Sequence, residues 1–333
     1  LDITQVVIDV SGTATDTLRD DATWRLNGPD VINDVGFYNA STDTLTFSGL
    51  NISVADATSE IYTVNAFMNT SNAVTDNATF ILTIDGDVDL TVASSGTQMT
   101  STIQVSNGFG GVFEVDAETL AFTEQAPRGS TSGVAFTTQP VANAIDAFGN
   151  IDLDFTETVT ISTFESLNET NFGVLTNATA TAVAGVATFS GLTFTATEDQ
   201  QEFSLGVTDD ADVGSDLPIS YTNTVKSDVV ATQLRFNTQP FPLSINNAST
   251  TSFSTVPVVN AVDANNVVDT GYSTTITLTE VNGAGAATMS ATGDTDGTVA
   301  SVSVSPSAGI ANFTDMQVTY TASGSTSEAF NLQ

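Results

Sequence analysis

Apolar and polar residues alternate along most of the chain with a period of two. Residues 193–196 and 312–320 follow this pattern, and residues 79–84 form a more continuously apolar run. Turn dipeptides such as Asn27-Gly28 interrupt these segments at intervals of about 8–12 residues. No stretch shows a convincing helical period. The pattern predicts an all-β protein whose short antiparallel strands pack as sandwiches.

Internal repeats suggest how the strands are grouped. Residues 134–140 match 234–240 through a shared Phe-x-Thr-Gln-Pro, and three further blocks follow in the same order: 141–147 with 258–264, 158–161 with 275–278, and 185–190 with 309–314. In this alignment the second copy has insertions around 244–254 and 283–303.

The first third of the chain shares less with these copies. Residues 46–52 mirror residues 188–194, but the Phe-x-Thr-Gln-Pro segment is absent. We therefore predict a divergent first domain and two repeats joined by very short linkers, with domains at 1–128, 129–227 and 228–333.

Composition removes several classes of function. The 333 residues include 39 acidic and 5 basic residues, for a net charge of −34, and contain neither cysteine nor histidine. Disulfides, thiol nucleophiles, thiolate zinc sites and histidine-based catalysis are therefore excluded. So negative a chain should be repelled by nucleic acid. With 20 phenylalanines and 40% hydrophobic residues, the chain can still build ordered cores.

The repeats resemble the immunoglobulin-like domains of large bacterial surface proteins. The resemblance rests on the Phe-x-Thr-Gln-Pro segment, on strands ending in Asp146-Ala147 and Asp263-Ala264, and on the late strand at 185–192. The Asp- and Thr-rich style without cysteine is similar to the surface adhesins of gliding Bacteroidota. The resemblance implies three tandem Ig-like β-sandwich domains in an elongated array, located outside the cell at its surface.

Carboxylates are the only abundant functional groups in the sequence that could form a site, and clustered carboxylates at turns suit calcium. The first cluster is Asp209, Asp210, Asp212 and Asp216, with Gly214 allowing the oxygens to converge. Shorter clusters are Asp85, Asp87 and Asp89, and Asp294 with Asp296. A fourth group comprises Asp146, Asn150, Asp152 and Asp154, beside a possible domain seam. The competing interpretation is that these are solvated turn residues that keep the surface soluble.

Catalysis is not expected from this sequence. Paired carboxylates could serve a glycosidase, but sugar-cleaving clefts usually add aromatic platforms, and the chain has 1 Trp and 5 Tyr. The single Trp24 is better explained as a core or domain-packing residue.

We therefore predict a non-catalytic stalk or filament segment of a large extracellular adhesin. The alternatives are a surface-layer lattice protein and an accessory β-sandwich module of a secreted enzyme. Because both ends lie inside strand patterns, we expect an ordered piece of a longer chain. Its partners would be further repeats of that chain, further copies of itself, or surface glycans and proteins. The sequence contains no run of about 18 apolar residues, so we expect no membrane insertion in this segment.

Overall fold

The computed structural model describes residues 1–333 apart from 69–73, 94–97, 165–172, 210–216 and 325–326. Over these described residues the protein is all-β with two short helices, which confirms the expected class. None of the described helices is long and apolar enough to cross a membrane.

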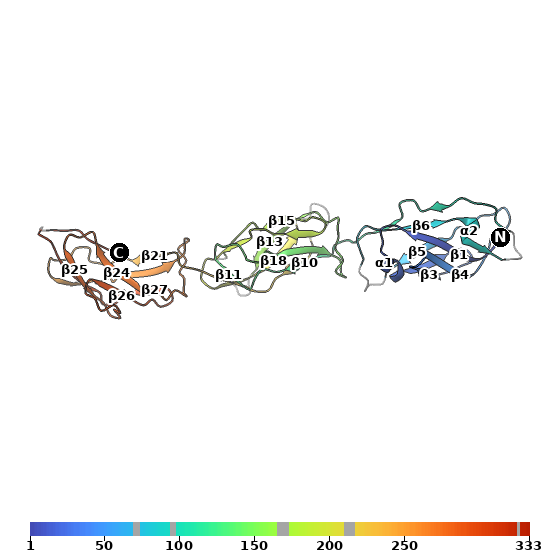
Figure 1. Ribbon diagram of the computed structural model, residues 1–333. Coiled ribbons are helices and arrows are strands. Elements are labelled where there is room, and N and C mark those ends of the chain that lie inside the picture. The colour runs from blue at the N-terminus through green and yellow to red at the C-terminus, as the bar shows by residue number, and fades with distance from the viewer. Residues whose placement is uncertain (69–73, 94–97, 165–172, 210–216, 325–326) are drawn as a thin grey trace.

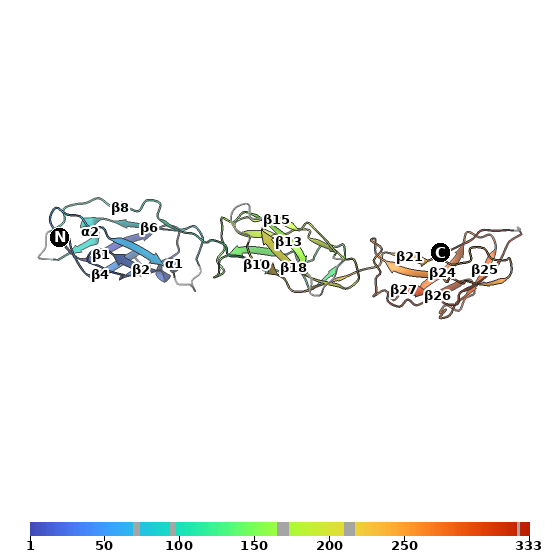
Figure 2. The same cartoon turned by 180° about the vertical axis from the view of Figure 1, so that it is seen from behind.

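The strands form three groups, each around its own hydrophobic core. Figures 1 and 2 show the groups end to end, with the N-terminus at the outer end of the first. We call residues 1–114, 118–228 and 232–333 lobes 1, 2 and 3. The intervening residues 115–117 and 229–231 are linkers 1 and 2.

Lobe 1 is built around one large antiparallel sheet with strand order β5-β2-β3-β4-β1-β6-β8. Two further strands extend it, because β7 pairs with β1 and β9 pairs with β6. The enclosed core includes Trp24, whose ring meets that of Phe80 edge-on at 5.3 Å. The strands are β1 (Asp2–Ser11), β2 (Thr23–Asn27), β3 (Asp34–Asn39), β4 (Thr44–Ser53), β5 (Thr63–Phe67), β6 (Ala78–Ile84), β7 (Leu90–Val92), β8 (Val105–Ser106) and β9 (Gly111–Phe113).

The two helices, α1 (Asp16–Asp21) and α2 (Gly86–Asp89), also belong to lobe 1. The Thr15 hydroxyl accepts a hydrogen bond from the Leu18 N–H and so caps the start of α1. Each helix spans fewer than two turns, so neither leaves a helical period in the sequence.

Lobe 2 is a sandwich. One sheet has the order β10-β12-β16, and the larger one has the order β11-β20-β18-β13-β15, with β19 beside β18. A separate pair, β14 and β17, completes it. The strands are β10 (Thr119–Glu124), β11 (Gly129–Thr131), β12 (Val141–Ile145), β13 (Thr158–Phe164), β14 (Val174–Thr176), β15 (Thr179–Thr181), β16 (Val186–Thr188), β17 (Thr193–Thr195), β18 (Gln201–Asp209), β19 (Ser220–Tyr221) and β20 (Val225–Asp228).

Lobe 3 has three described sheets, with orders β21-β23-β27, β22-β28-β25 and β26-β24-β29. The first matches β10-β12-β16 of lobe 2, and β24 with β29 matches β13 with β18. The strands are β21 (Gln233–Thr238), β22 (Thr250–Ser252), β23 (Val258–Val262), β24 (Ile276–Val281), β25 (Ala286–Ser290), β26 (Ser301–Val304), β27 (Ile310–Asn312), β28 (Gln317–Thr321) and β29 (Asn331–Leu332).

Strand pairing shows that one of the four repeat matches is wrong. Phe236 lies in β21 opposite Val259, and the residue in the same place in lobe 2 is Phe122, opposite Ala142. Both strands also carry an irregularity in register just after this phenylalanine. Phe136, which the sequence matched to Phe236, instead precedes β12.

The true counterpart of Phe136 is Phe253. Phe136 lies four residues before Pro140, and Phe253 lies four residues before Pro257. The carbonyls of these prolines accept equivalent hydrogen bonds, from the Phe189 and Phe313 N–H groups, each at 3.2 Å. The expected insertion at 244–254 therefore shrinks to three residues, because Phe236 and Phe253 are 17 positions apart and Phe122 and Phe136 are 14 apart.

The shifted match also bears on the first boundary. Strand β10 pairs with β12, and its Leu120 is 1% exposed in the core of lobe 2. The expected division after residue 128 would place this strand in the first domain. In the structure, the seam between the two cores lies at linker 1, before β10.

Candidate functional site

Each linker begins with a buried valine, and the two linkers make matching contacts at the joints between lobes. We call the junction of lobes 1 and 2 joint 1, and the junction of lobes 2 and 3 joint 2. Val115 in linker 1 is 4% exposed, and Val229 at the same place in linker 2 is 1% exposed. Two residues further on, Ala117 and Ala231 occupy equivalent positions, and each leads directly into the first strand of the next lobe. A buried valine restricts its linker, provided that the backbone groups of the linker find hydrogen-bond partners.

An aspartate of the preceding lobe supplies the first partner. At joint 1, Asp76 Oδ1 accepts the Val115 N–H at 2.9 Å and Asp76 Oδ2 accepts the Leu153 N–H of lobe 2 at 2.8 Å. One carboxylate thus binds both the linker and the next lobe.

Asp199 makes the same contacts at joint 2. Its Oδ1 accepts the Val229 N–H at 2.7 Å, and its Oδ2 accepts the Thr270 N–H of lobe 3 at 2.9 Å. The Thr270 hydroxyl also donates to Asp199 Oδ2.

A second aspartate, from the following lobe, binds the linker again. The Ala117 N–H donates to Asp152 Oδ2 at 3.1 Å, and the Ala231 N–H donates to Asp269 Oδ2 at 2.9 Å. Each linker is therefore held by carboxylates from both sides. Hydrogen bonds to a charged acceptor contribute more than neutral ones, about 1.5–3 kcal/mol each where they are protected from water.

Local sequence explains why Asp76 and Asp199 stand at the ends of their lobes. Each precedes a residue with positive φ, Asn77 at 60° and Gln200 at 62°, and the chain then enters β6 or β18. The N–H groups of these residues also donate to the aspartates, at 2.9 Å and 2.8 Å. The tight turn thus aims each carboxylate at the linker.

The two joints differ in polarity beyond this shared set. Asn150 of lobe 2 accepts the Val74 N–H of lobe 1 at 2.8 Å, and the Asn77 side chain donates to Asp154 at 3.2 Å. The position of Asn150 is taken in lobe 3 by Val267, which packs against the core of lobe 2. Joint 1 is therefore closed by polar contacts, and joint 2 adds an apolar one.

The electrostatics of Asp199 follow from its place in the joint. Burial opposes ionisation, but the hydrogen bonds from Thr270 and Val229 outweigh it and hold the pKa of Asp199 below its usual value. The ionised form is thus the form that the closed joint binds.

An acidic cleft of about 480 Å³ lies beside joint 1. Loss of water and the charges of Asp76 and Asp154 raise the pKa of Glu114 in this cleft. The fourth predicted group lies here in part, because Asp152 and Asp154 line the cleft while Asp146 binds backbone N–H groups of its own turn. The acidic lining residues are Glu114, Asp116, Asp152, Asp154, Glu157 and Asp209.

The carboxylates of the predicted cluster accept hydrogen bonds from other groups of the protein. The cluster comprises Asp85, Asp87 and Asp89. Thr102 donates its N–H to Asp87 at 2.7 Å and its hydroxyl to Asp85 and Asp87 at 2.6 and 2.8 Å. These hydrogen bonds lower the pKa of Asp87. Asp89 instead accepts the Asp85 N–H at 2.6 Å.

Asp294 and Asp296 also accept hydrogen bonds from groups of the protein. Hydrogen bonds from the Thr298 N–H and from the Ser301 and Ser303 hydroxyls lower the pKa of Asp296 to about 2. Asp294 Oδ1 accepts the Ser303 N–H at 3.1 Å. The pair therefore fixes a loop of lobe 3.

The leading calcium candidate falls mostly outside the described residues. This applies to Asp210, Asp212 and Asp216, whereas Asp209 is 7% exposed and accepts the Leu217 N–H at 2.9 Å. Within the described part of the chain, no three acidic residues are grouped so that they could hold a metal ion.

Comparison with known proteins gives no relative. The chain matches no protein-family model, and no curated protein is similar enough in sequence to count as a match.

Sequence reasoning missed Asp76, Asp199 and Asp269 as joint residues. The available signal was a short match between residues 75–82 and 198–205, in which an aspartate stands four residues before a core phenylalanine. Phe80 and Phe203 are that phenylalanine, and both are buried. The match is too short to be noticed without the strand pairing.

Proposed function

We propose that this chain is a non-catalytic stalk segment of an extracellular surface protein, made of three Ig-like β-sandwich units. The observation that carries the proposal is the repeated joint. Asp76 and Asp199 each bind a buried linker valine and the next lobe, so successive units are held in line by one recurring device. A spacer needs this property, and a chain of independent binding modules does not.

Charge and composition support the same proposal. A net charge of −34 spread over the chain favours an extended arrangement through self-repulsion, most strongly at low salt. Without histidine or cysteine, the chain lacks the commonest catalytic groups, and the described carboxylates of the predicted clusters mainly bind backbone and hydroxyl groups of their own loops. These features suit a structural role.

Small-angle scattering of the 333-residue chain tests the proposal. Three sandwiches in line give a rod about 110–120 Å long with a radius of gyration near 35 Å, whereas a single compact globule of this size would have about 20 Å. A value near 20 Å at physiological salt would reject the stalk.

A surface-layer lattice protein is the second candidate, and one surface favours it. Val35 and Phe37 of β3 are 59% and 70% exposed, and Phe67 of β5 is 55% exposed. Strands β3 and β5 flank β2 in the sheet of lobe 1. An exposed apolar patch on a sheet is a common self-association surface. Sedimentation at rising protein concentration separates the two candidates. A stalk remains a monomer, whereas a lattice protein associates, and the variant Phe37→Ser should not associate.

A further inference from the structure

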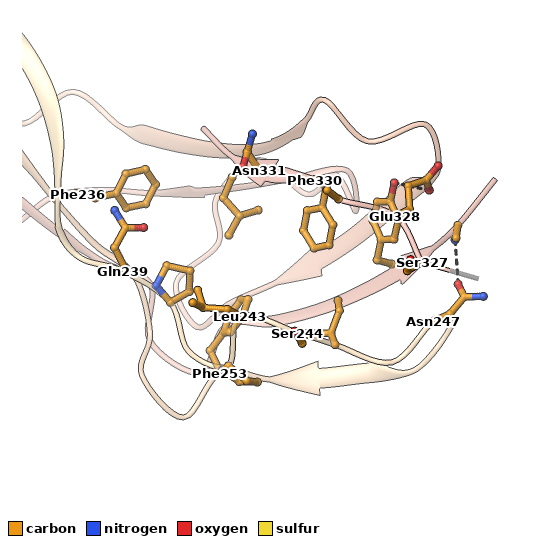
Figure 3. A pocket seen from close by; sticks show the side chains of 17 residues that line it. Phe236, Gln239, Leu243, Ser244, Asn247, Phe253, Ser327, Glu328, Phe330 and Asn331 are labelled. Atoms are coloured by element: carbon orange, nitrogen blue, oxygen red, sulfur yellow. Dashed lines mark hydrogen bonds between the residues drawn. The ribbon is translucent and has the colours of Figure 1, made fainter. Parts of the chain in front are cut away.

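Lobe 3 contains a groove of about 530 Å³ at the place where lobe 2 has a strand. In lobe 2, β20 lies between β11 and β18, pairing with the first in parallel and with the second antiparallel. In lobe 3 the groove lies between residues 243–245, which follow β21 as β11 follows β10, and β29, which corresponds to β18. Figure 3 shows Phe330 on one wall and Leu243 with Phe253 on the facing wall.

The correspondence of β29 with β18 rests on register. Leu332 faces Glu280 of β24, and Leu205 faces Thr163 at the same place in β13. Phe330 then takes the place of Phe203, two residues before the leucine in each case. Within the described sheets, β29 is an edge strand, whereas β18 is covered by β20.

The matched side chains are less buried in lobe 3 than in lobe 2, because the groove lacks a covering strand. Phe203 and Leu205 are fully buried, but Phe330 and Leu332 are only half-buried. The same holds across the sandwich, because Phe136 is 4% exposed and its counterpart Phe253 is half-buried. The residues are equally apolar in both lobes, so the difference comes from the uncovered position between them.

The strand in lobe 2 shows which chemistry fits there. Val225 and Ser227 of β20 are 0% exposed and point inward, and Val229, 1% exposed, continues the same alternation. Lys226 and Asp228 between them are exposed. In lobe 1, β9 pairs with β6 at the position that β20 takes on β18.

We infer that the groove of lobe 3 binds an extended polypeptide strand from outside residues 1–333, with small apolar side chains at alternate positions. The strand adds to the free edge of β29, gains backbone hydrogen bonds there, and inserts its apolar residues between Phe330, Leu332 and Phe253. This inference rests on the comparison of lobes 2 and 3 and does not depend on the stalk proposal.

The experiment adds a synthetic peptide of residues 222–230, with blocked ends, to the full 333-residue chain. Hydrogen exchange is followed by mass spectrometry in the segments 239–247 and 327–333, and the affinity is measured by calorimetry. We expect saturable protection of both groove walls. A matched peptide carrying Val225→Asp and Val229→Asp should bind at least about tenfold more weakly, because it would bury two charges in place of two valines.

Variants of the chain locate the binding. Leu243, 83% exposed on the groove wall, is changed in Leu243→Glu, and Val299, 67% exposed and outside the groove lining, is changed in the control Val299→Glu. The first should weaken binding by at least about tenfold and the second should leave it unchanged. Because both sites are exposed, both variants should fold.

Three outcomes would overturn the inference. They are no protection at millimolar peptide, equal binding of the two peptides, and protection that rises with chain concentration alone and ignores the peptide. The last would identify a second copy as the occupant.

Discussion

Asp76 and Asp199 occupy equivalent positions at the ends of successive lobes, and each joins its own lobe to the next through one carboxylate. The linker N–H and the N–H of the following lobe reach separate oxygens of the same side chain, at 2.7–2.9 Å. Bending the joint would separate these two donors, so the carboxylate resists bending as well as extension.

Removing either carboxylate should loosen its own joint and leave the other unchanged. Asp199→Asn retains one acceptor oxygen and loses the charge, and Asp76→Asn does the same at joint 1. The loss should cost about 1–3 kcal/mol of joint closure. Pairs of spin labels report it cleanly, because the chain has no cysteine of its own.

Suitable label positions are exposed residues on either side of each joint. Asp9→Cys with Thr181→Cys spans joint 1, and Thr181→Cys with Ser290→Cys spans joint 2. Each aspartate variant should broaden only the distance distribution across its own joint. Asp56→Asn, an exposed change in lobe 1, controls for loss of charge alone and should broaden neither.

Joint 2 should also open in acid. The pKa of Asp199 is held below its usual value in the closed joint, so closure is favoured fully above about pH 4 and is lost as the pH falls through the lowered pKa. The label pair across joint 2 should therefore show a broader distribution near pH 2.5 than at pH 7. In Asp199→Asn the joint is already loose at pH 7, and acid should add little. If acid broadened the distance distribution equally in the unmodified chain and in Asp199→Asn, closure would not depend on Asp199.

The strand class was predictable from the sequence, but the joints were not. Alternation in segments such as 312–320 depends only on neighbouring residues, and it correctly predicts strand at 317–320, although residues 313–316 form a turn between β27 and β28. The joint carboxylates act over long separations: Asp76 meets Leu153, and Asp199 meets Thr270. Such contacts leave no local pattern.

The Phe-x-Thr-Gln-Pro match shows how local identity can mislead. Gln139 and Gln239 share this motif but have different roles. Gln139 binds the Phe136 carbonyl and the Leu192 N–H, whereas Gln239 lines the groove of lobe 3. Pairing of β10 with β12 and of β21 with β23 gives the correct alignment, and only the structure supplies it.

Calcium binding stays a prediction, and it is tested by melting the chain with chelator and with millimolar calcium. A bound ion raises stability by about 0.4 kcal/mol when calcium equals its Kd and by about 2.7 kcal/mol at hundredfold excess. Asp296 and Asp87 are already satisfied by hydroxyl and N–H donors, so Asp296→Asn and Asp87→Asn should not remove the effect. Equal melting curves in chelator and calcium, at matched ionic strength, would contradict calcium binding.

Matched core phenylalanines should differ in how much they stabilise their lobes. Phe203 is fully buried, with its ring 3.9 Å from that of Phe194. Phe330 is half-buried and stacks on Tyr320 at 4.4 Å. Replacement by alanine should cost lobe 2 about 3–5 kcal/mol through transfer and cavity formation. The same change in lobe 3 should cost about 1–2 kcal/mol, because part of the ring already faces water.

Hydrogen exchange at increasing urea measures each lobe separately, through segments of β13 and of β24 in the same sample. Phe203→Ala should advance the opening of β13 and leave β24 almost unchanged, and Phe330→Ala should do the reverse by a smaller amount. The single tryptophan, Trp24 in the core of lobe 1, provides an internal reference, since its fluorescence transition should not move in either variant. Equal losses in the two lobes would mean that Phe330 is as well covered as Phe203, and an open groove beside β29 could not then be maintained.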